Sequence, residues 1–238
     1  MRSRLLLKTA FAIPFLSLWI GSVSAQQTAP GTLPDQEPVY DKLENHGRIL
    51  GILPNYKTIP DRKQKLRRLT PKDKFKLATI DAFDWSSLLV AGVYAAPEQF
   101  QNRYPSWGSG APGFGKRYAA GYADQAIGDY LTEAIFPSVL HEDPRYLRMA
   151  TGGFLRRSDW ALSRLIVTRT DRGGHQLNYS ELGGNAVAAG ISTIYYPAQN
   201  RTASDVVQKW GTQIVTDGFF NVLKEFWPDV QQKLFHAR

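Results

Sequence analysis

The chain has 238 residues, contains no cysteine and carries a formal net charge of +8. The lack of cysteine excludes disulfide bonds, thiol catalysis and metal or iron–sulfur sites with cysteine ligands. The basic residues are only mildly in excess and are interleaved with few aromatic residues, which argues against a nucleic-acid-binding protein.

The first 25 residues have the pattern of an export signal. Arg2, Arg4 and Lys8 form a basic start, residues 9–23 are apolar, and small residues precede a cleavage site after Ala25. Removal of this segment leaves a net charge of +5. An exported chain without cysteine suits the periplasm or cell envelope of a bacterium, and its length is sufficient for one core without disulfides.

Residues 26–67 are predicted to be a flexible or extended leader, followed by a helical domain at residues 68–238. Residues 26–47 are polar, rich in proline and without periodicity. The short apolar pieces in residues 48–60 are expected to lie on the domain as an extended segment. The basic stretch at residues 61–76 suits contact with anionic lipid headgroups better than a nucleic-acid groove.

The fold class is predicted to be mainly α, a single compact bundle of about five or six helices rich in glycine and alanine. The first helix is expected to begin at Pro71, with Thr70 as its cap and Asp73 as the acid of a capping box. A second apolar helix is expected at residues 84–97, and a loop rich in glycine and proline at residues 98–115.

The clearest amphipathic pattern lies in residues 116–136, where apolar residues recur at intervals of three and four. Gly121, Asp124 and Gly128 share another face of this helix, and the glycines allow a neighbouring helix to approach closely. Pro137 is expected to interrupt the helix.

The second half of the chain contains one ambiguous segment and two further helices. Residues 158–171 are predicted to form a helix that ends at the double glycine 173–174, although the β-branched run 166–168 also suits a strand. Residues 180–197 indicate a buried core helix rather than a membrane span, and residues 204–227 a last long helix. Four apolar segments are expected to end at a proline: Pro97, Pro137, Pro197 and Pro228.

Two polar stretches are candidate sites, HEDPRYLR at His141–Arg148 and TRTDRGGH at Thr168–His175. The first is interpreted as the hinge after a helix, with its two acids solvated or paired with Arg145 and Arg148. The second is interpreted as a helix end with glycine turns. Adjacent ionisable residues point in different directions on a helix, so the first stretch forms no site alone. The alternative for the second stretch is an anion-binding or acid–base cluster of Arg169, Asp171, Arg172 and His175 around the double glycine.

The two stretches would form an acid–base site only if folding brought them together. The candidate catalytic residues are then His141, Asp143, Asp171 and His175. Candidate binding residues for an anion are Arg145, Arg169 and Arg172.

Three polar residues within small-residue helices are expected to be structural: Asp124, Asn185 and Asp217. A carboxylate at a close helix contact must find a partner or retain its proton. We expect Asp124 or Asp217 to pair with an arginine such as Arg164 or Arg169. The alternative is a carboxylate pair that performs acid–base chemistry in a cleft.

Three blocks carry a resemblance to a known group of proteins: residues 114–148, 161–197 and 209–229. On these blocks the chain, from about Arg68 to its end, resembles exported cell-envelope proteins of unknown function from Gram-negative soil bacteria, notably acidobacteria. The resemblance implies a location in the cell envelope, and it implies no activity and no catalytic residues.

The sequence has no nucleophile elbow, no phosphate-binding loop and no spacing of zinc ligands, so we expect no cofactor and no metal. The leading expectation is a non-enzymatic envelope protein, periplasmic or peripherally bound to a membrane, with a structural or interaction role. Its expected partners are a membrane surface, another envelope protein or a second copy of the chain, and not a nucleic acid. The alternative is a periplasmic hydrolase that uses His141/Asp143 and Asp171/His175.

Overall fold

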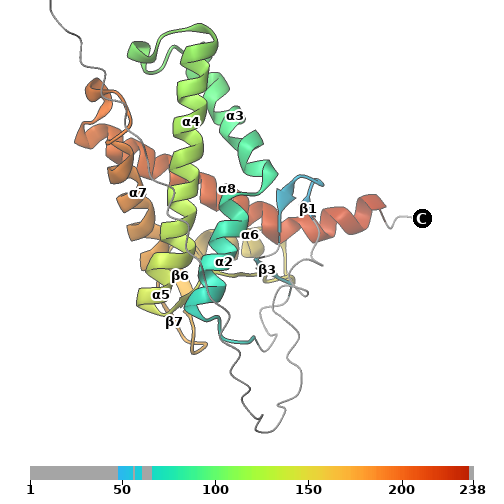
Figure 1. Cartoon of the computed structure of the whole chain (residues 1–238). Coiled ribbons are helices and arrows are strands. Elements are labelled where there is room, and N and C mark those ends of the chain that lie inside the picture. Colours follow the sequence, from blue (N-terminus) through green and yellow to red (C-terminus); the bar gives the residue numbers. More distant parts are fainter. Residues whose placement is uncertain (1–47, 56, 61–65, 236–238) are drawn as a thin grey trace, which may run out of the picture. The chain divides into compact units, whose positions relative to one another are not determined.

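The computed structural model describes residues 48–55, 57–60 and 66–235 (Figure 1). The predicted export signal and residues 26–47 lie outside the described residues. The described part is mainly α, as predicted, with a few short strands. None of its helices is both long enough and apolar enough to cross a membrane.

The first two helices begin at well-formed caps. Helix α2 spans Pro71–Ala82, and the capping box is confirmed: the Thr70 side chain accepts from the Asp73 N–H at 3.2 Å, while Asp73 accepts from the Thr70 N–H at 2.8 Å. Helix α3 spans Trp85–Phe100 and is capped by Asp84, whose side chain accepts from the N–H of the second helical residue at 2.9 Å. Both caps satisfy backbone N–H groups that have no partner within the helix.

The predicted amphipathic helix is longer than expected at both ends. It begins as α4 at Gly110–Asp129, continues through the π-helical segment η2 at Tyr130–Ile135, and ends as α5 at Phe136–Leu140. The loop predicted at residues 98–115 is therefore shorter and contains the 3₁₀ turn η1 at Pro105–Trp107.

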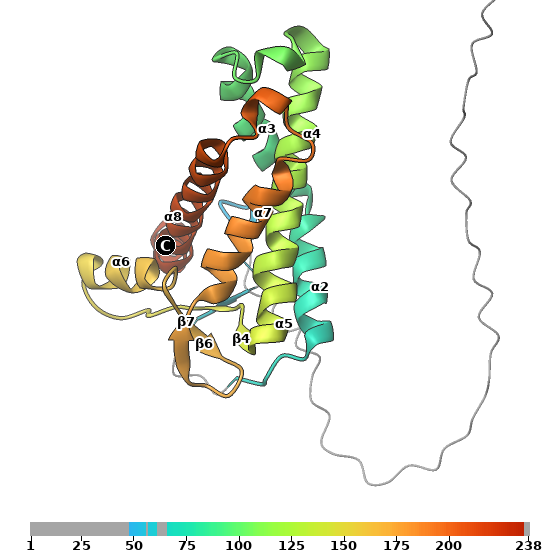
Figure 2. The same ribbon diagram turned by 90° about the vertical axis from the view of Figure 1, so that its left-hand side faces the viewer.

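The C-terminal helices complete the bundle. The π-helical segment η3 spans Ser180–Gly184 and continues as α7 at Asn185–Ser192, while α8 spans Ala203–Phe235. In Figures 1 and 2, α2, α4 and α7 lie side by side, and α8 runs across them on one side. A Cβ added at Gly184 would lie 3.0 Å from Thr132 Cγ2, so the glycine allows η3 to pack closely on η2.

The prolines do not end the helices as predicted. Pro97 lies inside α3 and Pro228 inside α8, while Pro137 lies in the first turn of α5. Pro197 follows α7, but the helix has already ended at Ser192. A proline removes one backbone hydrogen bond, and this loss is tolerated where packing compensates or where the N–H has no helical partner.

Residues 158–171 form a helix and a strand, so the predicted single helix is wrong in its second half. Helix α6 spans Phe154–Ser163, and the β-branched run lies in strand β6 at Val167–Thr170. Strand β6 pairs antiparallel with β4 at Glu142–Asp143 on one side and with β7 at His175–Leu177 on the other. Two neighbouring strands outweigh the local preference for helix.

The segment before α2 forms short strands that pack on the helices. Strands β1 (Arg48–Ile49) and β2 (Leu53–Pro54) are antiparallel, and β3 (Thr58–Ile59) is parallel to β5 (Tyr146–Leu147). Ile49 and Ile59 are 1% and 5% exposed, so this extended segment contributes to the core.

Candidate functional site

A cavity of about 940 Å³ lies between α3, α4, α7 and α8, with the segment around β3 and the β4–β6 strands also contributing to its wall. Small-molecule sites in proteins enclose about 300–1,000 Å³. The elements that line the cavity are far apart in the sequence, so the cavity exists only in the folded chain.

An ion-pair cluster around Lys57 forms one part of the wall. The Lys57 ammonium contacts the carboxylates of Asp81 and Glu133, which are 8% and 9% exposed. Burial alone disfavours the ammonium, but the neighbouring carboxylates hold the pKa of Lys57 above its usual value. Burial raises the pKa of Glu133 to about 7; the Asp81 carboxylate adds to this effect and Lys57 opposes it.

A second acidic group joins η3 to α8. The side chains of Glu181 and Asp217 lie close enough to influence each other's pKa. Asn185 Nδ2 donates to Glu181 Oε1 and to Asp217 Oδ2, both at 3.1 Å, and Gln213 donates to Asp217 at 3.0 Å. Burial raises the pKa of both carboxyl groups, and the charge of Asp217 adds to the effect on Glu181.

Two charged residues between these groups lack an ion-pair partner among the described residues. Burial, together with the charges of Glu133 and Asp81, raises the pKa of Asp129. Burial and the charge of Lys57 lower the pKa of Lys224, which reaches the cavity from α8. Three buried carboxyl oxygens here accept no hydrogen bond: Asp81 Oδ1, Asp129 Oδ2 and Glu133 Oε2.

Asp124 lies at another part of the cavity wall and joins α4 to α8. It accepts hydrogen bonds from Tyr195 at 2.5 Å, Tyr196 at 2.7 Å and Lys209 at 2.9 Å. The cation that pairs with Asp124 is therefore a lysine, and the prediction of an arginine partner is wrong for this residue. Lys209 Nζ also lies 3.0 Å from the centre of the Tyr196 ring, a cation–π contact.

The two polar stretches selected from the sequence do meet, through strands β4, β6 and β7. Asp143 is opposite Arg169 in β6, and Arg169 is opposite His175 in β7. His141 and His175 are both exposed. His141 immediately precedes β4 and His175 begins β7, so β6 lies between the two strands that follow them. Of the two histidines, only His175 lines the cavity.

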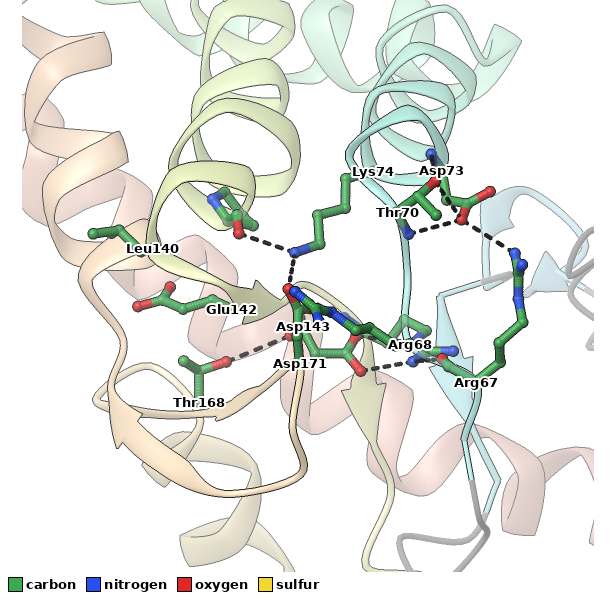
Figure 3. Close-up of polar contacts among 12 residues, drawn as sticks. Arg67, Arg68, Thr70, Asp73, Lys74, Leu140, Glu142, Asp143, Thr168 and Asp171 are labelled. Atoms are coloured by element: carbon green, nitrogen blue, oxygen red, sulfur yellow. Dashed lines mark hydrogen bonds and ion pairs between the residues drawn. The ribbon is translucent and has the colours of Figure 1, made fainter.

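The two candidate aspartates are held in buried ion pairs (Figure 3). Asp143 forms a bidentate pair with Arg145, with a shortest contact of 2.7 Å. Asp171 lies 2.9 Å from Lys74, which also donates to the Pro137 carbonyl at 2.9 Å. Both aspartates therefore act in the fold as partners of basic residues.

The remaining residues of the first stretch form the predicted hinge after a helix. Its two acids, however, are buried and not solvated. His141 ends α5 in the left-handed conformation, with φ of 57°. Glu142 is 1% exposed and accepts from the N–H groups of Tyr179 and Ser180 at 3.2 and 3.0 Å, at the start of η3. Arg148 pairs with Asp229 of α8.

The three arginines proposed as anion ligands differ in position. Arg145 is occupied by Asp143 and by the Arg67 carbonyl at 2.8 Å. Arg169 lines the cavity, and Arg172 is exposed in the turn between β6 and β7. Arg145 lines the cavity together with Arg169, and Arg172 is not among the lining residues.

Comparison of the chain with protein-family models, with curated proteins and with solved structures finds no match. Within the described residues, no group of three or more histidine, aspartate or glutamate side chains is arranged to hold a metal ion. The features that bear on function are therefore the cavity and the charged residues of its wall.

Proposed function

We propose that the chain is a non-catalytic binding protein of the bacterial cell envelope whose cavity holds a small organic molecule. The observation that carries this proposal is the cavity itself, about 940 Å³ in volume and lined by buried polar groups that lack partners. An unpartnered buried carboxyl oxygen is unfavourable, and a bound ligand with hydrogen-bond donors would remove that penalty. The signal-like start of the sequence supports export to the envelope.

A variant that fills the cavity tests this function. Gly121 lines the cavity on α4, and nothing lies within 4 Å of a Cβ placed there, so Gly121→Leu adds bulk at a position where the Cβ has room. Gly115 is on the same helix, has equally open space and does not line the cavity, so Gly115→Leu is the matched control.

The measurement is thermal unfolding with a panel of amines, amino acids, carboxylates, sugars and nucleosides. We expect at least one class to raise Tm of the wild-type chain and of Gly115→Leu, and to leave Tm of Gly121→Leu unchanged. If no class raises Tm, or if Gly121→Leu responds as strongly as the control, the cavity is not a binding site.

A second candidate function is acid–base hydrolysis, favoured by the carboxyl pair of Glu181 and Asp217. Two neighbouring carboxyl groups with raised pKa can supply a general acid and a general base. Mass spectrometry of a bound ligand after prolonged incubation separates the two functions. Intact ligand supports binding alone, whereas conversion that is lost in Glu181→Gln supports hydrolysis.

A further inference from the structure

The acidic part of the cavity has more carboxyl groups than ammonium groups. Five carboxyl groups lie there with two lysines, Lys57 and Lys224. The carboxyl groups are Asp81, Asp129, Glu133, Glu181 and Asp217. Lys57 pairs with two of them, and the other three form no ion pair with a described lysine or arginine. A positively charged ligand would favour the ionised form of these carboxyl groups.

The unpartnered oxygens also call for hydrogen-bond donors. Asp81 Oδ1 and Glu133 Oε2 accept no hydrogen bond although the two residues are 8% and 9% exposed, and Asp129 Oδ2 is likewise unpartnered. An ammonium group supplies both the positive charge and up to three N–H donors. A neutral sugar or alcohol would supply donors without the charge.

A second acidic position lies further along the cavity wall. Glu98 of α3 lines the cavity near Asp124, and burial raises its pKa. Asp124 is five residues before Asp129 on α4, a separation of about 7.5 Å along the helix axis. A ligand with more than one ammonium group would therefore meet acidic side chains at more than one place on the wall.

Apolar side chains on the cavity wall suit an aliphatic chain. Val90, Ala188 and Phe220 line the cavity from three different helices. Tyr94 and Tyr196 add aromatic rings, whose faces attract cations. A wall that combines acidic and apolar groups is the complement of a diamine or polyamine.

We propose that the cavity binds a linear aliphatic polyamine, with one of its ammonium groups at Asp129, Glu181 and Asp217. This inference rests on the proposed binding function and names its ligand class. Lys224, which forms no ion pair with a described residue, sets the strength of binding by repelling the nearest ammonium group.

Isothermal titration calorimetry with putrescine, spermidine and spermine tests the inference. We expect binding to the wild-type chain, and Asp129→Asn to weaken it by about tenfold or more through the loss of a charge-assisted hydrogen bond. Lys224→Gln should strengthen amine binding, whereas it would weaken the binding of an anion. Asp217→Asn is a second variant, in case Asp129→Asn does not fold.

The matched control is Asp159→Asn, which makes the same charge change on an exposed residue of α6 that does not line the cavity. Equal losses in Asp129→Asn and Asp159→Asn would indicate non-specific attraction and overturn the inference. Binding of Mg²⁺ or of an anion without any amine would also overturn it, while leaving the binding function intact. The proposed function itself fails if no class of ligand in the Tm panel raises Tm of the wild-type chain, or if Gly121→Leu responds as strongly as Gly115→Leu.

Discussion

Lys74 of α2 and Asp171 of the β6–β7 turn form a buried ion pair, with 2.9 Å between Nζ and Oδ2, although they are 97 residues apart in the sequence. Their side chains are 1% and 3% exposed. The same ammonium donates to the carbonyl of Pro137 (Figure 3). One lysine thus joins α2, the start of α5 and the turn of the small sheet.

Replacement of Lys74 by methionine should lower the free energy of unfolding by about 3–5 kcal/mol, because it leaves the Asp171 carboxylate buried without its partner. Urea unfolding measures the change. Arg68→Ala is the control, since its side chain is 56% exposed and lies 3.7 Å from Asp171, and an exposed pair contributes little. Equal losses in the two variants would contradict a buried role for Lys74.

Glu225 of α8 forms contacts that hold the segment after β5 and helix α6 against α8. It is fully buried and accepts from Tyr146 at 2.9 Å, from the Met149 N–H at 2.9 Å and from Arg157 at 2.9 Å. Glu225→Gln removes the charge that Arg157 faces and replaces one acceptor with a donor. We expect a loss of about 3 kcal/mol or more in urea unfolding.

Asp229→Asn provides the comparison for Glu225, because Asp229 lies one turn further along α8 and pairs with Arg148 and Arg157. Its side chain is 38% exposed, so water weakens these pairs and a smaller loss is expected. A larger loss for Asp229→Asn than for Glu225→Gln would show that the buried carboxylate is not the main anchor.

The stability of the empty protein should fall as the pH rises from about 4.5 to 7. Burial raises the pKa of Glu133 from 4.5 to about 7, so the folded chain holds a proton that the unfolded chain has released. The folded chain binds more protons in this interval, and the stability gained at low pH is lost as the pH passes the folded pKa. Burial raises the pKa of Asp129, Glu181 and Asp217 in the same direction.

Tm measured from pH 5 to pH 8 checks this dependence. Glu133→Gln should flatten the curve, since glutamine does not titrate and each unit of pKa shift corresponds to about 1.4 kcal/mol. A curve of unchanged slope in Glu133→Gln would assign the pH dependence to other groups. If a polyamine binds as proposed, its presence should reduce the loss of Tm at pH 8, because it stabilises the ionised carboxylates.

The mainly helical fold follows from patterns that are local in the sequence. Thr70 and Asp73 predict the start of α2, and the spacing of apolar residues predicts the long helix that includes α4. Strand β6 could not be assigned in this way, because its partners β4 and β7 lie outside the local window. Long-range pairing outweighed local preference there.

Only some of the residues that line the cavity could be predicted from the sequence. Asp124, Asn185 and Asp217 were selected because a polar residue among small apolar ones needs a partner, and all three line the cavity. Asp129 and Glu133 carry the same signal, as acids within an apolar helix, and were missed. Lys57 gave no signal at all, because its role depends on carboxylates contributed by other elements.

The contact between η2 and η3 depends on Gly184 and offers a last test. A Cβ at this position would lie 3.0 Å from Thr132 Cγ2 and 3.3 Å from the backbone of Leu131. Gly184→Ala should therefore force the two π-helical segments apart and lower the free energy of unfolding by about 1–3 kcal/mol. Because Glu133 and Glu181 lie on these two segments, the variant should also lower the affinity of the cavity for any ligand that it binds.

Gly190→Ala is the matched control for Gly184→Ala, since Gly190 lies in α7 and nothing is within 4 Å of a Cβ placed there. In a helix interior alanine is favoured over glycine by about 1 kcal/mol, so this control should raise Tm. Helix preference alone would make both alanine variants more stable. If Gly184→Ala lowers stability while Gly190→Ala raises it, the difference comes from steric contact at η2. A rise in Tm for Gly184→Ala would show that η2 and η3 have room to adjust.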